Sequence, residues 1–174
     1  MVLSNEKKRE YMKRLLMSRM RILLNHGFYG LLLMHMTYAL DEECKTVATD
    51  GKCIYFNPFF LEQLNDSELD FVMMHEILHV VLQHCLRQGN REKEQFNIAC
   101  DIVVNSQILL SQNKKTEAIT LRKYGEAMHL TPEGKEGCEY TAEQVYAMLM
   151  TSKKDEGGKA LYFIYDRYIG IHVR

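Results

Sequence analysis

Two histidines and a glutamate near the middle of the 174-residue chain have a spacing that suits metal chemistry, in the segment HEILH. On a helix, residues four apart lie on the same face, so His75 and His79 can reach one metal ion together. Glu76 stands beside them, and its carboxylate can accept a proton from a metal-bound water without being a ligand itself. The pattern therefore predicts a Zn2+ ion held by His75 and His79, with Glu76 as the catalytic base.

The residues around this motif decide between a metal site and a chance pair of surface histidines. We expect one helix from about Glu68 to Gln88, and its residues from Phe71 to Leu82 are apolar apart from the motif itself. A helix that is apolar all round is buried, and buried imidazoles and carboxylates need partners. The composition of this helix therefore favours the metal site.

The following helix, predicted over about 92–112, offers a third ligand. Asn97, Asp101 and Asn105 follow one another at four-residue spacing and form one polar stripe on an otherwise apolar helix. A buried aspartate needs a cation or a set of donors, so Asp101 is predicted as the third metal ligand. Asn97 and Asn105 would orient Asp101 or a histidine. Two alternatives stay open: the stripe is a solvated face, or Asp101 is a partner of one of the two histidines.

His84 is the other candidate, and helix geometry argues against it. It follows His79 by five residues, which places it about 140° around a continuous helix, on a different face. We therefore expect His84 to be a packing or helix-end residue, and a ligand only if the helix ended before it.

Composition narrows the class of protein. The 22 basic and 23 acidic side chains leave a net charge of −1, which predicts no nucleic-acid partner and no polybasic membrane anchor. The longest apolar stretch near the N-terminus, Phe28 to Met36, is too short to span a bilayer. With no secretory signal and five scattered cysteines, none in CxxC spacing, we expect a cytoplasmic protein with free thiols rather than a cysteine-rich structural zinc site.

Hydrophobic periodicity and turn residues divide the chain into four segments. The run Gly30 to Leu40 is predicted as a buried strand, with a helix as the alternative, and Asp50-Gly51 predicts a hairpin turn. Asn57-Pro58 suits a helix start, and Leu161 to Tyr165 reads as a strand. The expected segments are an N-terminal amphipathic helix in 1–29, a metal-binding core in 30–112, a long polar loop in 113–140, and a helix and strand in 141–174.

The sequence resembles a known family over a stretch much longer than the HExxH motif. TDGKCIYFNPFFLEQLNDSELDFVMMHEILHVVLQHCLRQG followed by FNIACDIVVN resembles the N-terminal metallopeptidase domain of the family related to von Willebrand factor A (VWA)-like proteins. That family shows a TDG hairpin, an N-P helix start, HExxHxxxxH and an aromatic-N-x-A-x-D-x-x-x-N segment. The resemblance covers roughly Gly30 to Leu110. It implies a zincin-like α+β fold, mainly helical with a small mixed or antiparallel sheet, in which the HExxH helix packs against the following helix with Asp101.

The resemblance also implies an activity. His75, Glu76 and His79 would take the usual zincin roles with Asp101 in support, and His84 belongs to the family pattern. The function would be zinc-dependent hydrolysis of peptide bonds by Glu76-assisted attack of a zinc-bound water. Zincin architecture suggests that the segment Lys52, Cys53, Ile54, Tyr55 and Phe56 is a sheet edge on which an extended substrate lies, an ordinary paired strand being the alternative. Tyr124 and His129 are chemically suitable oxyanion donors, but neither can be assigned.

Relatives in this family suggest partners besides a peptide or protein substrate. They usually continue into a VWA-like domain, which we do not find in this chain, and they are often associated with a MoxR-type AAA+ ATPase. The alternative function is therefore a non-proteolytic, zinc-binding interaction module that works with such a protein.

Overall fold

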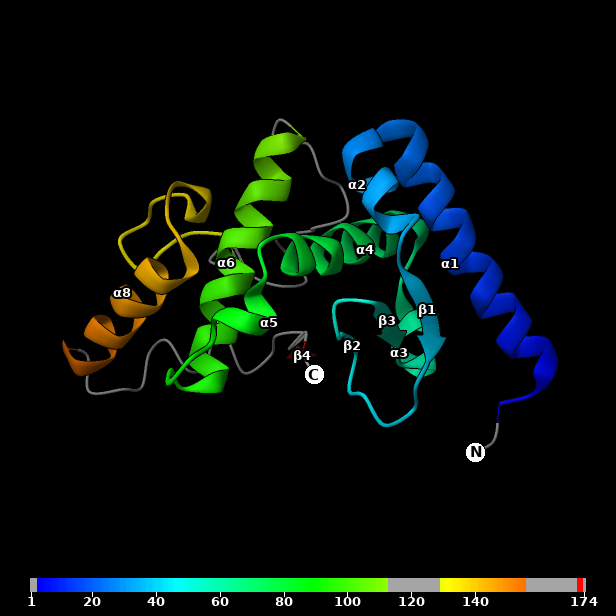
Figure 1. Cartoon of the computed structure of the whole chain (residues 1–174), viewed down its shortest axis with the longest axis horizontal. Helices are drawn as coiled ribbons and strands as arrows, with labels where there is room; N and C mark the ends of the chain where they lie inside the picture. Colours follow the sequence, from blue (N-terminus) through cyan, green and yellow to red (C-terminus); the bar gives the residue numbers. More distant parts are fainter. Residues whose placement is uncertain (1–2, 113–128, 156–171, 174) are drawn as a thin grey trace. The chain divides into compact units, whose positions relative to one another are not determined.

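A computed structural model describes residues 3–112, 129–155 and 172–173 (Figure 1). The chain divides into two compact units, Met1–Cys85 with Ile171–Arg174 and Leu86–Gly170, which are described separately. Helices dominate both units, and one small mixed sheet belongs to the first, so the expected α+β class is confirmed. The predicted strand Leu161 to Tyr165 lies outside the described residues.

Two consecutive helices open the first unit. Helix α1 (Asn5–Asn25) begins at Ser4, whose hydroxyl accepts the Lys7 N–H at 3.2 Å, and it matches the predicted amphipathic helix. Helix α2 (Gly27–Leu33) follows directly, and strand β1 (Thr37–Leu40) comes after it. The prediction of one strand over Gly30 to Leu40 is therefore wrong in its first part, because a short apolar run suits a buried helix as well as a strand.

The sheet has the strand order β1-β3-β2-β4. Strands β2 (Val47–Thr49) and β3 (Cys53–Phe56) form the predicted hairpin, whose turn is held by the Asp50 carboxylate. β1 pairs with β3 in parallel, and β4 (His172–Val173) pairs with β2 in parallel. The prediction that the segment Lys52–Phe56 is a sheet edge open to substrate is wrong, because β3 is paired on both sides.

Side-chain caps determine where the next two helices begin. The Asn57 side chain accepts the N–H groups of Phe59 and Phe60 at the start of helix α3 (Pro58–Gln63), as its sequence predicts. Helix α4 (Asp66–Val81) starts with a capping box, in which Asn65 and Glu68 exchange hydrogen bonds of 2.9 Å.

The end of α4 differs from the prediction. The helix stops at Val81 instead of continuing to Gln88, since Gln83 takes a left-handed backbone conformation with φ of 54°. A new short helix, α5 (His84–Arg87), follows. No glycine or proline marks this break, so periodicity alone extends the helix through it.

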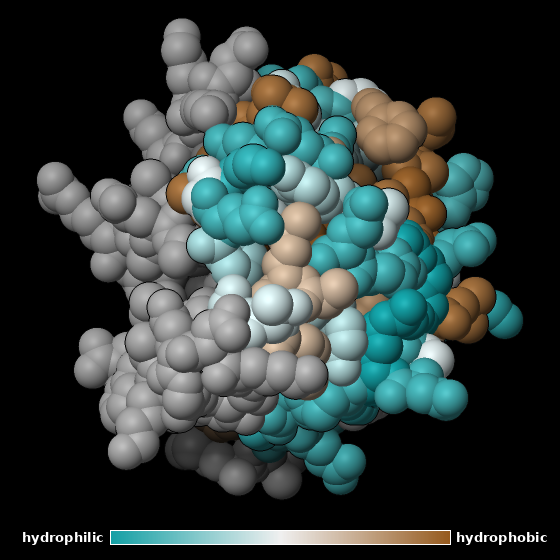
Figure 2. All heavy atoms as spheres, turned by 90° about the vertical axis from the view of Figure 1, so that its left-hand side faces the viewer, coloured by the Kyte–Doolittle hydropathy of each residue, from teal (hydrophilic) through white to brown (hydrophobic). Residues whose placement is uncertain are grey.

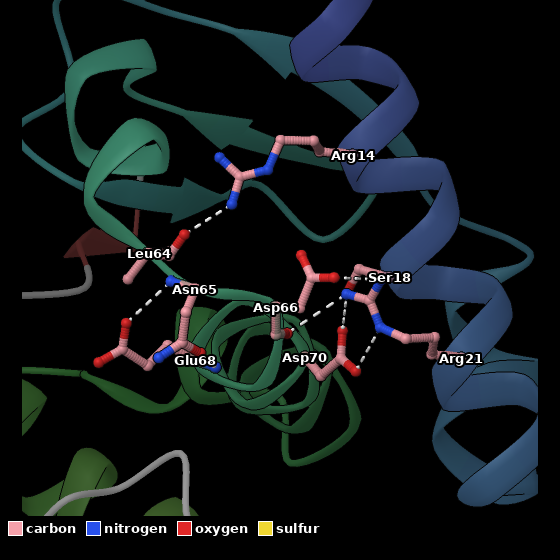
Figure 3. Close-up of polar contacts among 8 residues, drawn as sticks. All are labelled: Arg14, Ser18, Arg21, Leu64, Asn65, Asp66, Glu68 and Asp70. Atoms are coloured by element: carbon pink, nitrogen blue, oxygen red, sulfur yellow. Dashed lines mark hydrogen bonds and ion pairs between the residues drawn. The ribbon is translucent and has the colours of Figure 1, made fainter.

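A polar clamp joins α4 to α1 (Figure 3). The Asp70 carboxylate accepts the Ser18 hydroxyl at 2.6 Å and two N–H groups of Arg21, from Nε at 2.9 Å and from Nη2 at 2.7 Å. Hydrogen bonding to Asp70 raises the pKa of the Arg21 guanidinium. α4 also packs against α2 and β2, so neighbours from three elements hold it in place.

The second unit is built around helix α6 (Lys93–Ser111), which the sequence predicts over 92–112. Phe96 and Cys100 of α6 pack against Ala142 and Tyr146 of helix α8 (Ala142–Asp155). The short helix η2 (Gly137–Glu139) lies so close to α6 that a Cβ on Gly137 would meet the Ile102 carbonyl oxygen at 2.6 Å. Among the residues coloured in Figure 2, most on the visible face are hydrophilic, and hydrophobic ones gather toward the upper right. Within the described residues, every helix is too short or too polar to cross a membrane.

Replacing Gly30 by alanine is expected to destabilise the first unit. An added Cβ would collide with the backbone of Leu23 in α1, which cannot yield as a flexible side chain can. The expected loss is about 1–3 kcal/mol or more of unfolding free energy, measured by urea denaturation. Gly27→Ala in the same helix is the matched control, because nothing lies within 4 Å of its added Cβ. Equal stability of the two variants would contradict the close packing of α1 and α2.

Removing the carboxylate of Asp70 is expected to weaken the clamp on α4. Asp70→Ala leaves Ser18 and Arg21 without their shared acceptor, at a cost of about 1–3 kcal/mol in unfolding free energy. Asp66→Ala is the control, because that side chain is 69% exposed and lies 3.2 Å from a single Arg21 nitrogen. Its cost should stay below about 1 kcal/mol, as for exposed ion pairs. A smaller loss for Asp70→Ala than for Asp66→Ala would refute the clamp.

Candidate metal centre

Two imidazoles come together in the second half of α4. The Nε2 atoms of His75 and His79 lie 2.8 Å apart, and the two residues are 2% and 0% exposed. Two nitrogens bound tetrahedrally to zinc at about 2.0–2.1 Å stand about 3.3 Å apart, so the rings need to separate by only about 0.5 Å to share an ion. The prediction that the four-residue spacing brings both histidines together is confirmed.

Glu76 stands between the two histidines in the sequence and is completely buried. The helix α4 has no solvated face along the motif: apart from the histidines and Glu76, the residues from Phe71 to Leu78 are buried as well. Removing a carboxylate and two imidazoles from water costs free energy unless they are paired or bind a cation. All three side chains are buried, as the apolar sequence of this helix predicts. This argues against a chance pair of surface histidines and favours a metal site.

Asp101 is the third candidate ligand. It is buried on α6, and together with His75 and His79 it makes up a group of buried side chains that could hold a metal ion. Two neutral nitrogens and one carboxylate oxygen are a ligand set that zinc accepts, and three protein ligands are usual at catalytic zinc sites. The three buried side chains therefore form a candidate metal site.

Two asparagines, Asn97 and Asn105, share the polar stripe of α6 with Asp101. The Asn97 amide nitrogen lies 3.5 Å from the Asp101 carboxylate, at the outer limit of a hydrogen bond, and Asn97 is half-buried. Asn105 is buried. The interpretation of the whole stripe as a solvated face is therefore wrong, while the orienting roles of Asn97 and Asn105 stay predictions.

His84 is a buried residue just past the end of α4, as expected, but it lies beside His79 rather than on another face. Its Nδ1 is 3.1 Å from Nδ1 of His79, and the two rings meet edge to face with centroids 5.0 Å apart. The helical wheel placed His84 on another face because it assumed a helix up to Gln88. Since α4 ends at Val81, the chain turns and His84 comes back toward His79. No residue type in the local sequence signals this turn, and only the family pattern HExxHxxxxH included His84.

Other chemically suitable side chains are not members of the candidate metal group. Among the described residues, no cysteine belongs to a metal-binding group, and burial raises the pKa of the Cys85 thiol, which keeps it protonated at neutral pH. His129 Nδ1 pairs with Glu136 at 3.0 Å, and the same carboxylate accepts the Ser106 hydroxyl at 2.9 Å. This network links the start of the 129–140 segment to α6. Tyr124 lies outside the described residues.

Comparison with known proteins agrees with this geometry. Residues 10–161 match the model of a family described as "Putative metallopeptidase domain". The match spans most of the chain, so the chain belongs to this family. Searches among curated proteins and among solved structures found no match.

The three buried ligand candidates predict measurable metal binding. Protein purified without added metal, or metal-free protein titrated with zinc, should hold about one equivalent, as a three-ligand site does. His79→Ala and Asp101→Ala should each weaken binding by more than about a hundredfold, beyond the cost of removing a supporting residue. Chelator competition measures both affinities.

A histidine outside the group serves as the control. His35→Ala alters an exposed histidine that is no member of the group and should bind zinc like the wild type. No uptake of zinc by the wild-type protein would contradict the metal site. Unchanged affinity in Asp101→Ala would remove Asp101 from the ligand set and leave the histidine pair.

Proposed function

We propose that this protein is a zinc-dependent metallopeptidase of the zincin type. The observation that carries the proposal is the converging pair His75 and His79, with Glu76 buried beside them on one helix. Membership of a metallopeptidase-like family supports the same chemistry. His75, His79 and Asp101 would hold the ion, and the choice of zinc follows from their nitrogen and carboxylate donors.

The ion, when bound, supplies a Lewis acid that polarises the scissile carbonyl and lowers the pKa of the attacking water. Glu76 follows His75 directly, so its carboxylate projects about 100° around the helix from that ring. From there it would accept a proton from the attacking water and deliver it to the nitrogen of the leaving amine. The histidines act as neutral ligands, and the carboxylate of Asp101 would balance part of the cation's charge.

The buried setting of Glu76 suits this role. Its carboxylate is completely buried in α4 and so is held away from bulk water. Proton transfer by a positioned carboxylate contributes roughly 10²–10⁴-fold to a hydrolytic rate.

Glu76→Gln tests the proposal directly. The amide keeps the shape of the side chain but cannot accept the proton, so peptide cleavage should fall by at least about a hundredfold. Zinc content should stay at the wild-type level, because Glu76 is not a predicted ligand. Cleavage is measured by mass-spectrometric comparison of new N-termini in a proteome incubated with each protein, a readout that responds to any peptide substrate.

The matched control is Asp66→Asn. It makes the same change from carboxylate to amide on the same helix, at an exposed position in its first turn. This variant should cleave like the wild type. Zinc bound by a wild-type protein whose new N-termini do not differ from those of Glu76→Gln would refute the peptidase and favour a non-proteolytic metal-binding module.

A further inference from the structure

The chain reverses direction directly after the metal-binding helix. Leu82 caps α4 by donating its N–H toward the Leu78 and Val80 carbonyls, and Gln83 then adopts a positive φ of 54°. A left-handed conformation is uncommon for a residue with a Cβ and costs free energy. Gln83 nevertheless adopts this conformation, and the next residue, His84, is buried beside His79 as a result.

The contact between His84 and His79 uses a particular pair of nitrogens. Nδ1 of His84 lies 3.1 Å from Nδ1 of His79, whereas Nε2 of His79 lies 2.8 Å from Nε2 of His75. His79 therefore presents one ring nitrogen to the proposed metal position and the other to His84. His84 is not among the three residues whose ligand atoms cluster.

Hydrogen-bond chemistry fixes the direction of this contact once a metal is bound. A neutral imidazole carries one N–H, and a nitrogen that ligates a metal must offer its lone pair. If Nε2 of His79 is the ligand, its proton is on Nδ1, and Nδ1 of His84 must be the acceptor. Ligating histidines usually donate this second N–H to a carboxylate or a carbonyl, and here an imidazole takes that place.

We infer that His84 is a positioning residue of the metal site: it accepts the Nδ1 proton of His79 and holds that ring in the orientation and tautomer that bind the ion. This inference rests on the proposed function, because it requires His79 to be a ligand. Through the backbone turn at Gln83, the first residue of α5 contributes to the site that the second half of α4 forms.

Three substitutions at His84 separate this role from mere packing. They are His84→Asn, His84→Gln and His84→Leu, each made in the full 174-residue chain. Asparagine carries its amide oxygen on Cγ, the atom to which the Nδ1 of histidine is bonded, so it can still accept the His79 proton. Glutamine moves its oxygen one bond further out, and leucine has no acceptor.

The expected result is a graded change in zinc affinity, measured by chelator competition. His84→Leu and His84→Gln should bind zinc about 10–100-fold more weakly, the usual cost of losing a supporting hydrogen bond. His84→Asn should stay within a few-fold of the wild type. All three should bind the same number of ions, and the visible absorption spectrum of their cobalt forms should keep the wild-type coordination.

Each other outcome has a distinct meaning. A wild-type protein that binds no zinc defeats the proposed function itself. Wild-type affinity in all three variants defeats the inference alone and leaves the metal site intact. Weak binding in all three, with a changed cobalt spectrum, would make His84 a ligand and overturn its positioning role. If His84→Leu does not fold, the comparison of His84→Asn with His84→Gln still decides, because both keep an amide.

Discussion

The site depends on the burial of ionisable side chains inside a helix that has no solvated side. From Phe71 to His79 every residue of α4 is buried, and three of them are His75, Glu76 and His79. Taking such groups out of water is unfavourable unless they meet a cation or hydrogen-bond partners. The ion that we propose would bind the two imidazoles and so meet this requirement for both of them.

A helix of this kind must be held by contacts outside the motif. The start of α4 is defined by the Asn65 and Glu68 capping box, and its first turns are tied to α1 by Asp70. All of these contacts from α4 precede Phe71, so they lie before the stretch that carries the histidines. α1 also packs closely on α2 at Gly30. Polar bonds therefore hold the first turns of α4, and buried apolar residues surround the candidate metal ligands.

The end of α4 shows how a local backbone strain can serve a site. Gln83 adopts a left-handed conformation that most residues avoid, and the turn that results buries His84 against His79. Continuing the helix would have satisfied local propensity but would have pointed His84 elsewhere. The contact between the two ring nitrogens accompanies the turn, at a place where no glycine or proline ends the helix.

Sequence periodicity alone determined the helices that carry the site and the facing pair His75 and His79, because both follow from the 3.6-residue repeat within one element. The hairpin at Asp50 and the caps at Asn57 and Asn65 were also determined by the sequence, since their signals are local side-chain chemistry. Tertiary structure alone decided that β3 is central, that Gly30 to Leu40 divides into helix and strand, and that His84 returns to His79. Strand neighbours and helix ends of this kind depend on packing between residues far apart in the chain or on a strained turn. Neither leaves a periodic pattern in the sequence.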